Sequence, residues 1–345
     1  MNDPVLETLL LPLTGGEIAL PAEGQALFLR ARTGDALGRL PRDRFVCDQS
    51  FRPAREALTK AGFALREDGD HRRYPLVLVL PQRQRDENRA LLAQAVAATQ
   101  TGGIVLAAAS NLEGAKTLQG DLEALAGTVT SLSKNKCRAF WASVEPGHID
   151  KTLLAQWLAG DAPRAIEGGR FMSRPGLFAW DRIDAGSRLL ADHLPPGLTG
   201  KMADLGAGFG YLSDEVLGRC PGVTRLDVVE AEQRALDMAR LNLATYGERV
   251  AFHWLDATGP LPDRYDAIVS NPPFHVDRAD RHDIGQAFIR SAARALVSGG
   301  QLWLVANRHL PYEETLNAAF KSVATVAQNN FFKVFKAIGP RSASK

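Results

Sequence analysis

The stretch "MADLGAGFGYLS", residues 202–213, decides the fold of the second half of this chain. Its apolar start, which ends at Asp204, is typical of a buried strand, and we expect a helix to begin near Ser213. Three glycines separate them: Gly206, Gly208 and Gly210. Such a turn lets a ligand approach the backbone, although a glycine turn without a ligand has the same pattern. A dinucleotide is disfavoured, because the third glycine of G-x-G-x-x-G would fall on Tyr211.

Carboxylates end the next two predicted strands, Glu230 in the strand at 224–232 and Asp256 in the strand at 250–257. At the carboxyl edge of a sheet, Glu230 is placed to accept hydrogen bonds from ribose hydroxyls, and Asp256 from an adenine amino group. The alternatives are a helix N-terminal acid at Glu230 and a turn-initiating aspartate at Asp256. The convergence of these groups on one edge favours a ligand site.

Two parts of the chain, residues 74–111 and 265–308, repeat the same order of elements. Each reads as a strand, a helix, a Gly-Gly turn and a second strand, which is the βαβ unit of a parallel sheet. The sequence therefore predicts a duplicated α/β fold. Small residues, Pro and Gly interrupt the pattern at 159–170, so we expect domains at 1–165 and 166–345.

The C-terminus predicts an antiparallel hairpin. The stretches "VATVAQ" (323–328) and "FFKVFKAIG" (331–339) are separated by Asn329 and Asn330 alone. Asparagine tolerates positive φ, and we expect that property to form the tight turn. The second sheet should therefore be parallel apart from one reversed strand.

Composition excludes several classes of protein. The 345 residues suffice for two domains of usual size, and no segment has the ~20 apolar residues of a membrane helix. The N-terminus lacks the features of an export signal, so we expect a cytoplasmic protein. Cys47, Cys137 and Cys220 have no metal-ligand spacing and are expected to be reduced thiols. With a formal charge of +2, any attraction to RNA must come from local patches.

The strand at 265–270 ends in "NPPF", residues 271–274. The order of motifs resembles the class I methyltransferases that use S-adenosylmethionine. This resemblance implies that the Asn271 side chain and the Pro272 carbonyl accept hydrogen bonds from a planar NH2 group, while Phe274 stacks on it. The prolines would hold these acceptors in position. Asn-Pro-Pro as a merely stiff turn is the alternative.

Longer motifs resemble the ribosomal RNA guanine-N2 methyltransferases, namely the small-subunit methyltransferase C family and its large-subunit relative, methyltransferase G. The resemblance covers residues 166–339 well and rests on these stretches: "GLFAWDRIDAGSRLL", "DLGAGFG", "SNPPFH", "SGGQLWLVANRHLPY" and "NNFFKVFKAI". It implies two tandem class I methyltransferase-like domains, each a mostly parallel sheet flanked by helices. The first would lack a cofactor site and support the second and the RNA. In the first half, Leu80-Pro81-Gln82 stands at the position of residues 271–273 in the second half.

This resemblance implies methylation of the exocyclic N2 amino group of a guanine in 16S ribosomal RNA, by a monomer that acts on the small ribosomal subunit without a metal. Catalytic roles fall to Asn271, Pro272 and Phe274. The cofactor residues would be Asp204, Gly206, Gly208, Gly210, Glu230, Asp256, Asn271 and Asp184. Pro273 and His275 would contact the substrate. The chain departs from the family pattern at 179–184, where an expected arginine is shifted, and at Ala207, where cysteine is usual.

Basic residues of the first half are candidate RNA contacts, because Lys and Arg neutralise phosphates. The stretch "LSKNKCR" (132–138) supplies Lys134, Lys136 and Arg138. Further arginines lie at 66, 72, 73, 83, 85 and 89, diluted by acids. An ordinary solvated surface is the alternative. A guanine in a helix hides its amino group, so the base must be flipped or lie in a loosened site.

Several other functions fit the same motifs. Methylation of guanine N2 in 23S ribosomal RNA, of adenine N6, or of a protein glutamine also uses Asn-Pro-Pro-aromatic. The C-terminal run from "ANRHLPY" to "NNFFKVFKAI" favours the guanine family. An RNA-binding protein that keeps the fold without turnover is a further alternative, and the intact polar set at 204, 230, 256 and 271 argues against it.

Overall fold

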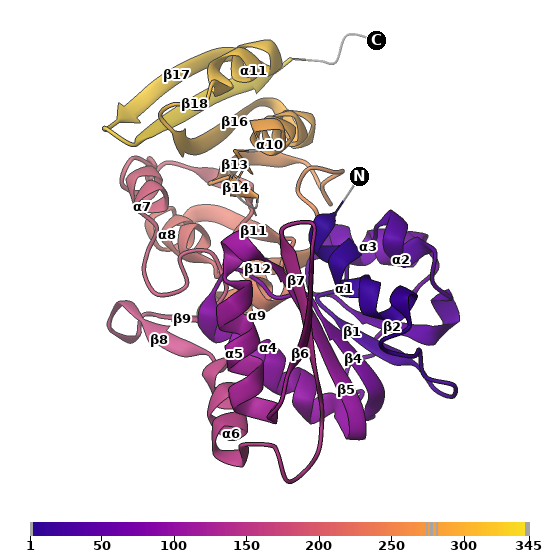
Figure 1. Ribbon diagram of the computed structural model, residues 1–345. Coiled ribbons are helices and arrows are strands. Elements are labelled where there is room, and N and C mark those ends of the chain that lie inside the picture. Colours follow the sequence, from indigo (N-terminus) through magenta and orange to yellow (C-terminus); the bar gives the residue numbers. More distant parts are fainter. Residues whose placement is uncertain (1–2, 274, 277–278, 281, 342–345) are drawn as a thin grey trace. The chain divides into compact units, whose positions relative to one another are not determined.

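The computed structural model describes residues 3–273, 275–276, 279–280 and 282–341. By internal contacts the chain divides into two compact units, Met1–Ala162 and Pro163–Lys345. Within the described residues each unit is built on a seven-stranded sheet with flanking helices (Figure 1). The predicted fold of two mostly parallel α/β sheets is confirmed.

The first unit begins with helix α1, whose Asp3 cap accepts hydrogen bonds from Val5 and Leu6 N–H. Its strands are β1 (Ala26–Leu29), β2 (Phe45–Asp48), β3 (Ala64–Leu65), β4 (Tyr74–Val79), β5 (Thr99–Ser110), β6 (Thr130–Lys134) and β7 (Cys137–Ser143). Its helices are α1 (Pro4–Gly15), α2 (Asp35–Gly38), α3 (Arg52–Lys60), α4 (Arg85–Ala98), α5 (Ala115–Ala126) and α6 (Lys151–Gly160), with 3-10 turns at Arg42–Arg44 and Asn111–Glu113.

The second unit starts with a short hairpin, β8 (Arg164–Ile166) and β9 (Phe171–Ser173). The main sheet contains β10 (Thr199–Leu205), β11 (Gly222–Glu230), β12 (Val250–Trp254), β13 (Tyr265–Ser270), β16 (Leu296–Asn307), β17 (Phe320–Gln328) and β18 (Phe332–Pro340). A separate pair joins β14 (His275–Val276) to β15 (Ala279–Asp280). The helices are α7 (Ala185–Asp192), α8 (Tyr211–Arg219), α9 (Gln233–Asn242), α10 (His282–Ala295) and α11 (Tyr312–Ala319), with 3-10 turns at Glu167–Gly169 and Ala244–Arg249.

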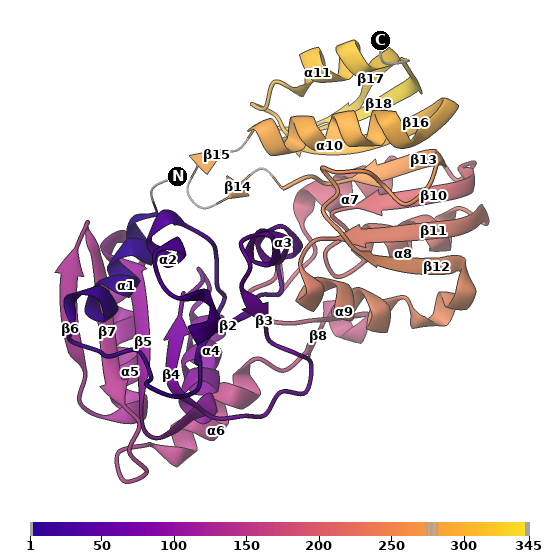
Figure 2. The ribbon, with the colours of Figure 1, turned by 90° about the vertical axis from the view of Figure 1, so that its right-hand side faces the viewer.

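The two sheets share one topology. The first has the order β3-β2-β1-β4-β5-β7-β6, and the second has the order β12-β11-β10-β13-β16-β18-β17. Figure 2 shows the second sheet with β12 at one edge and the β17–β18 hairpin at the other. In each sheet the last two strands form an antiparallel hairpin. Its second strand, β7 or β18, is the reversed one and lies between two strands to which it is antiparallel. The identical order supports the predicted duplication.

The Gly-Gly pairs lie inside strands β5 and β16, so the predicted turn before each strand is wrong. Pairing starts earlier, at Thr99 and Leu296, and the register shifts as it crosses the glycines. A Cβ on Gly103 would lie 2.8 Å from the Pro75 carbonyl oxygen, and one on Gly300 would lie 3.2 Å from that of Asp266. Both sheets therefore use glycine for a close approach of neighbouring backbones at an irregular register.

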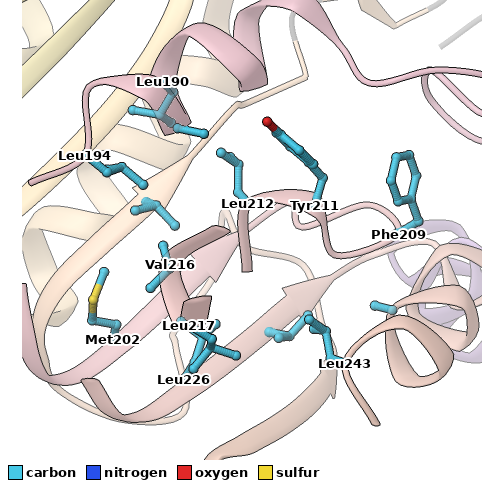
Figure 3. Packing of buried hydrophobic residues seen from close by; sticks show 14 of the residues in the cluster. Leu190, Leu194, Met202, Phe209, Tyr211, Leu212, Val216, Leu217, Leu226 and Leu243 are labelled. Carbon is cyan, nitrogen blue, oxygen red and sulfur yellow. The ribbon is translucent and has the colours of Figure 1, made fainter. Parts of the chain in front are cut away.

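Apolar side chains alternate between the two faces of the second sheet. Met202, Leu226 and Val228 pack with α7, α8 and α9, and Figure 3 shows part of this cluster around Leu190 and Val216. Ala203 and Leu205 point to the opposite face and pack with α10 and α11. Because neighbouring residues face opposite sides, both faces of β10 are covered and its carboxyl end is left for the site.

The C-terminal hairpin is confirmed, but the predicted reason for its turn is wrong. Asn329 and Asn330 are not among the described residues with positive φ. Instead the Asn329 Oδ1 accepts hydrogen bonds from the N–H groups of Phe331 and Phe332, at 2.9 and 2.8 Å. Asparagine closes this turn with its side chain rather than with its backbone. Separately, none of the described helices combines the length and apolar character needed to cross a bilayer.

We predict that Gly103→Ala destabilises the protein by ~1–3 kcal/mol, because its Cβ would meet Thr99 Cγ2 at 2.7 Å and the Pro75 oxygen at 2.8 Å. Gly120→Ala is the matched control, since that glycine lies in α5 with nothing within 4 Å of its Cβ position. Helix propensity should leave the control neutral or up to ~1 kcal/mol more stable. Urea unfolding followed by circular dichroism compares them, and equal stabilities would contradict the close approach.

Candidate active site

Four strands of the second sheet, β12, β11, β10 and β13, run parallel and end at one edge. After β10 the chain turns through Gly206, Gly208 and Gly210, whose φ angles are 72°, 57° and 92°. These left-handed conformations are open to glycine and unfavourable for most other residues. A Cβ on Gly208 would meet open space. The turn therefore leaves room beside its backbone for a ligand.

Asp204 lies under this turn and is fully buried. Ser213 of α8 donates to its Oδ2 at 2.7 Å, whereas its Oδ1 has no hydrogen-bond partner among the described residues. Burial, opposed by hydrogen bonds from Ser213 and aided by the nearby Glu230, raises the pKa of Asp204 to about 7. An unpartnered buried carboxyl oxygen is costly. A hydrogen-bond donor from a ligand or a water molecule would therefore be stabilised at the Asp204 Oδ1.

Glu230 ties the glycine turn to the end of β11. Its Oε2 accepts the N–H of Gly208 and its Oε1 accepts the N–H of Glu232, both at 2.8 Å. Burial raises the pKa of the Glu230 carboxyl, and the donated N–H bonds oppose this rise. The N-terminal cap of α9 is Glu232, not Glu230. Glu230 thus connects the glycine turn to the residue that caps α9.

Asp256 lies just beyond β12 and is half-buried. Its Oδ1 accepts the N–H of Thr258 at 2.9 Å, which is the turn-initiating role named as the alternative. A carboxylate has lone pairs for further donors, so this bond and a ligand contact are compatible. Its assignment to the cofactor stays a prediction.

Asn271 follows β13 and is oriented by the start of α7. Its Nδ2 donates to Asp184 Oδ2 at 2.9 Å and to Ser187 Oγ at 2.8 Å. Asp184 caps α7, and the same Oδ2 accepts the Ser187 N–H at 2.8 Å. Because a carboxylate only accepts hydrogen bonds, the amide nitrogen must face α7. Both Nδ2 hydrogens are then used, and Oδ1 points away as an acceptor.

Ser187 was missed by the sequence reasoning. The available signal was an aspartate directly before the helical stretch "AGSRLL" (185–190), which marks a helix cap and places Ser187 in the first turn. Nothing in the sequence paired that cap with an asparagine far along the chain. The sequence predicts that Asp184 holds the cofactor. In the structure its carboxylate caps α7 and accepts a hydrogen bond from the Asn271 amide.

The rest of the Asn-Pro-Pro-Phe segment is only partly described. Pro272 is buried and Pro273 is exposed. Phe274, expected to stack on the substrate, lies outside the described residues. His275 is paired with Asp280 in the β14–β15 ladder, and its side chain also lies outside the description. Their substrate roles remain predictions.

The candidate RNA residues of the first unit differ in availability. Lys134 and Lys136 are exposed at the tip of the β6–β7 hairpin. Arg138 donates to Gln119 Oε1 at 2.8 Å and packs on α5. Most of the other arginines are ion-paired: Arg66 with Asp48, Arg72 with Asp70, and Arg85 and Arg89 with Asp121. The hairpin tip therefore offers two exposed lysines, and Arg73 and Arg83 are also exposed.

The first unit has different side chains at the equivalent edge. Leu29 pairs with Val79 in the first sheet as Leu205 pairs with Ser270 in the second. This register places four residues of the first unit opposite Asp204, Gly206, Glu230 and Asn271: Phe28, Arg30, Gln49 and Leu80. Arg30 has a φ of 55°, so the turn conformation persists without glycine.

Arg30 stands at the position of Gly206 in the first unit's turn, and its side chain is buried. The guanidinium is 9% exposed and its Nη2 lies 2.6 Å from Glu87 Oε1. Gln49 donates to the Ala31 carbonyl at 2.6 Å. The first unit therefore has a buried, ion-paired arginine where the second unit has Gly206. Separately, no group of three metal-binding side chains occurs within the described residues.

Comparison with known proteins agrees with this geometry. Residues 168–336 match the methyltransferase small domain. Ribosomal RNA small subunit methyltransferase C of Escherichia coli is 37% identical over 181 residues, which are 52% of this chain and 52% of that protein. The Salmonella paratyphi B protein of the same name is 36% identical over 184 residues, covering 53% and 54%. The chain thus spans about half the length of the curated relatives it matches.

A solved structure matches nearly the whole chain. The T. thermophilus 16S rRNA N2 methyltransferase, in complex with AdoMet and guanosine, superposes with a TM-score of 0.81 and 25% identity, over 98% of this chain and 92% of that one. Fold and site together define a two-unit protein with a methyltransferase domain in its second half. The second half of the chain is thus similar in sequence to these small-subunit methyltransferases, and the whole chain shares the fold of the T. thermophilus protein.

We predict that Asp204→Asn changes how stability depends on pH. The folded pKa of about 7 exceeds the ordinary value of 3.8. The Asp204 carboxyl group therefore contributes most to wild-type stability below pH 4, and this contribution is lost as the pH rises through 7. The variant keeps an acceptor for Ser213 and does not titrate. It should gain up to ~4 kcal/mol relative to the wild type between pH 4 and 8. Urea unfolding at several pH values measures this, and parallel curves would contradict it.

Proposed function

We propose that the second unit catalyses S-adenosylmethionine-dependent methylation of the exocyclic N2 amino group of a guanine in 16S ribosomal RNA. The observation that carries the proposal is Asn271, whose amide nitrogen is held by Asp184 and Ser187 so that its oxygen is presented as an acceptor. It lies at the sheet edge that also holds the glycine turn. The relatives named small subunit methyltransferase C and the similar T. thermophilus structure support the choice of base and of RNA.

The residues present fit the proposed cofactor. S-adenosylmethionine, when bound, supplies a methyl group on a positively charged sulfur. The open space at Gly208 admits a ligand against the turn, and the unpartnered Asp204 Oδ1 is an acceptor. We propose that Glu230 binds the ribose hydroxyls and Asp256 the adenine amino group. The carboxyl edge of a parallel sheet is where such ligands bind.

The chain's part in the chemistry is to hold a poor nucleophile. The lone pair of the guanine amino group is delocalised into the ring, and it becomes available only as the nitrogen pyramidalises and gains positive charge. The Asn271 oxygen and the Pro272 carbonyl are proposed to accept its two hydrogens. Both acceptors stabilise that developing charge and fix the direction of the amine. Phe274 is proposed to stack on the base, and Pro273 and His275 to border it.

The proposed substrate has three rivals, which experiment distinguishes. Adenine N6, a protein glutamine and a guanine of 23S ribosomal RNA also present a planar NH2 group to the same acceptors. An RNA-binding protein without turnover is the non-enzyme outcome. The small-subunit names of the relatives favour 16S RNA.

We propose that the first unit binds no cofactor and supports RNA binding, with Lys134 and Lys136 contacting phosphates and Arg138 bracing their hairpin. The first part is supported by Arg30, a buried and ion-paired residue at the position where the second unit has Gly206. Exposed lysines at a hairpin tip support the second. The proposed substrate implies a cytoplasmic protein, and we propose that it acts as a monomer on the small ribosomal subunit.

The deciding experiment is nucleoside mass spectrometry. The purified protein and S-adenosylmethionine are incubated with unmodified transcripts of the two ribosomal RNAs, and separately with small subunits assembled on unmodified RNA. N2-methylguanosine in small-subunit RNA supports the proposal. N6-methyladenosine, or N2-methylguanosine in the large-subunit RNA alone, selects a rival substrate. No methylation of any of them would contradict the proposed enzyme.

Asn271→Ala should lower kcat by ~100-fold or more, the size expected when one positioning or electrostatic contact is removed. Affinity for S-adenosylmethionine should change little, because the proposed acceptor faces the amine. Isothermal titration and methyl-transfer rates measure the two quantities. Equal losses of binding and turnover would contradict this role.

Asp184→Ala tests whether this residue orients Asn271 or holds the cofactor. As an orienting residue, its loss should lower kcat at least ~10-fold with the cofactor Kd nearly unchanged, because Asn271 can then rotate. Asp184→Asn keeps an oxygen acceptor and should retain most of the rate. A fall in cofactor affinity ahead of kcat would instead support the cofactor role expected from the sequence. Thermal unfolding of both variants separates these effects from loss of the α7 cap.

A further inference from the structure

A pocket lies at the same end of the second sheet as the glycine turn and Asn271. It has a volume of about 580 Å3 and is formed where β16 ends and the β17–β18 turn begins. Its lining residues are Asn307, Arg308, His309, Asn330, Phe331 and Phe332. Arg308 is exposed, and Phe331 is 72% exposed. An aromatic ring this exposed is unfavourable in water unless a partner covers it.

The backbone holds this aromatic ring in a defined place. Arg308 N–H donates to the Phe331 carbonyl at 2.7 Å. Asn329 Oδ1 accepts the N–H groups of Phe331 and Phe332, and Asn329 N–H donates to the Phe332 carbonyl at 2.9 Å. The turn is thus closed from both sides. Phe331 is presented by a fixed backbone, which reduces the entropy lost when a ligand stacks on it.

The pocket adjoins the residues that orient Asn271. A Cβ on Gly186 would lie 3.0 Å from the Phe332 ring, so this glycine lets α7 pack against the ring. Gly186 lies between Asp184 and Ser187, the two partners of the Asn271 amide. A chain of direct contacts therefore connects the amide acceptor, the first turn of α7 and the pocket wall.

The first unit serves as an internal comparison. Ser110 pairs with Cys137 there as Asn307 pairs with Phe332 in the second unit. The same backbone bond occurs, from Asn111 N–H to the Lys136 carbonyl at 3.0 Å. The side chains equivalent to Arg308 and Phe331 are those of Asn111 and Lys136. The fold thus forms this corner without an aromatic ring or an arginine, and only the unit with the Asn-Pro-Pro site has both.

We propose that this pocket binds the nucleotide next to the target guanosine in the RNA strand, with its base stacked on Phe331 and its phosphate paired with Arg308. The proposal rests on the proposed function and adds a subsite to it. Single-stranded RNA is commonly bound by bases stacked on aromatic rings and phosphates held by arginine. A target base taken out of its stack leaves such a neighbour unstacked and able to bind here.

Phe331→Ala should raise the KM for the RNA transcript roughly 5- to 100-fold, the range expected for one lost base stack. Its kcat at saturating RNA should stay near the wild-type value, and Phe331→Trp should restore KM. Arg308→Ala should weaken RNA binding and lower the slope of log Kd against log salt by about 1. Val326→Ala is the control, because it removes an exposed apolar side chain from the same hairpin.

Two readouts keep this proposal separate from the proposed function. Fluorescence anisotropy with a labelled RNA hairpin measures binding without turnover, and methylation of free guanosine reports the amine site alone. Phe331→Ala should weaken hairpin binding and leave the guanosine rate unchanged. Wild-type binding by Phe331→Ala, or an equal loss on free guanosine, would overturn the subsite. If the wild type methylates no guanine but needs Phe331 for RNA binding, the proposed function fails and the subsite stands.

Discussion

The second unit depends on one oxygen atom, Oδ2 of Asp184, which accepts hydrogen bonds from both the Ser187 backbone and the Asn271 side chain. The first bond starts helix α7, and the second sets the direction of an amide at the end of β13. Because one carboxylate does both, the helix cannot shift without turning the acceptor. Gly186 extends the coupling to the β17–β18 hairpin by admitting the Phe332 ring.

The two units show that the fold does not depend on the side chains of the candidate active site. Both keep the same strand order and the same glycine irregularity in the fifth strand. Even the local bond after the second strand persists, since Gln49 accepts the Phe51 N–H as Glu230 accepts that of Glu232. What differs is the set of side chains at the edge. Hydrophobic burial and backbone pairing maintain the sheet, whereas a ligand site needs space and unsatisfied acceptors. The first unit has a buried arginine where the second has Gly206.

Reasoning from the sequence was most reliable where a residue type allows few conformations. Glycines at 206, 208 and 210 predicted a tight turn, and all three adopt positive φ. It was wrong at Asn329 and at the Gly-Gly pairs, since asparagine can close a turn with either backbone or side chain and glycine suits both a turn and a strand irregularity. Asp256 shows the same ambiguity, because one carboxylate can serve a turn and a ligand.

By itself the sequence determined the two α/β units, the carboxyl edge of the second sheet and the likeness of the second half to methyltransferases, because burial periodicity and short motifs are local properties of the chain. Tertiary structure alone decided which way the Asn271 amide faces, that Asp204 keeps an unpartnered oxygen, and that Phe331 borders a pocket beside α7. These facts join residues distant in sequence. They follow from the register of neighbouring strands, which a local pattern does not encode.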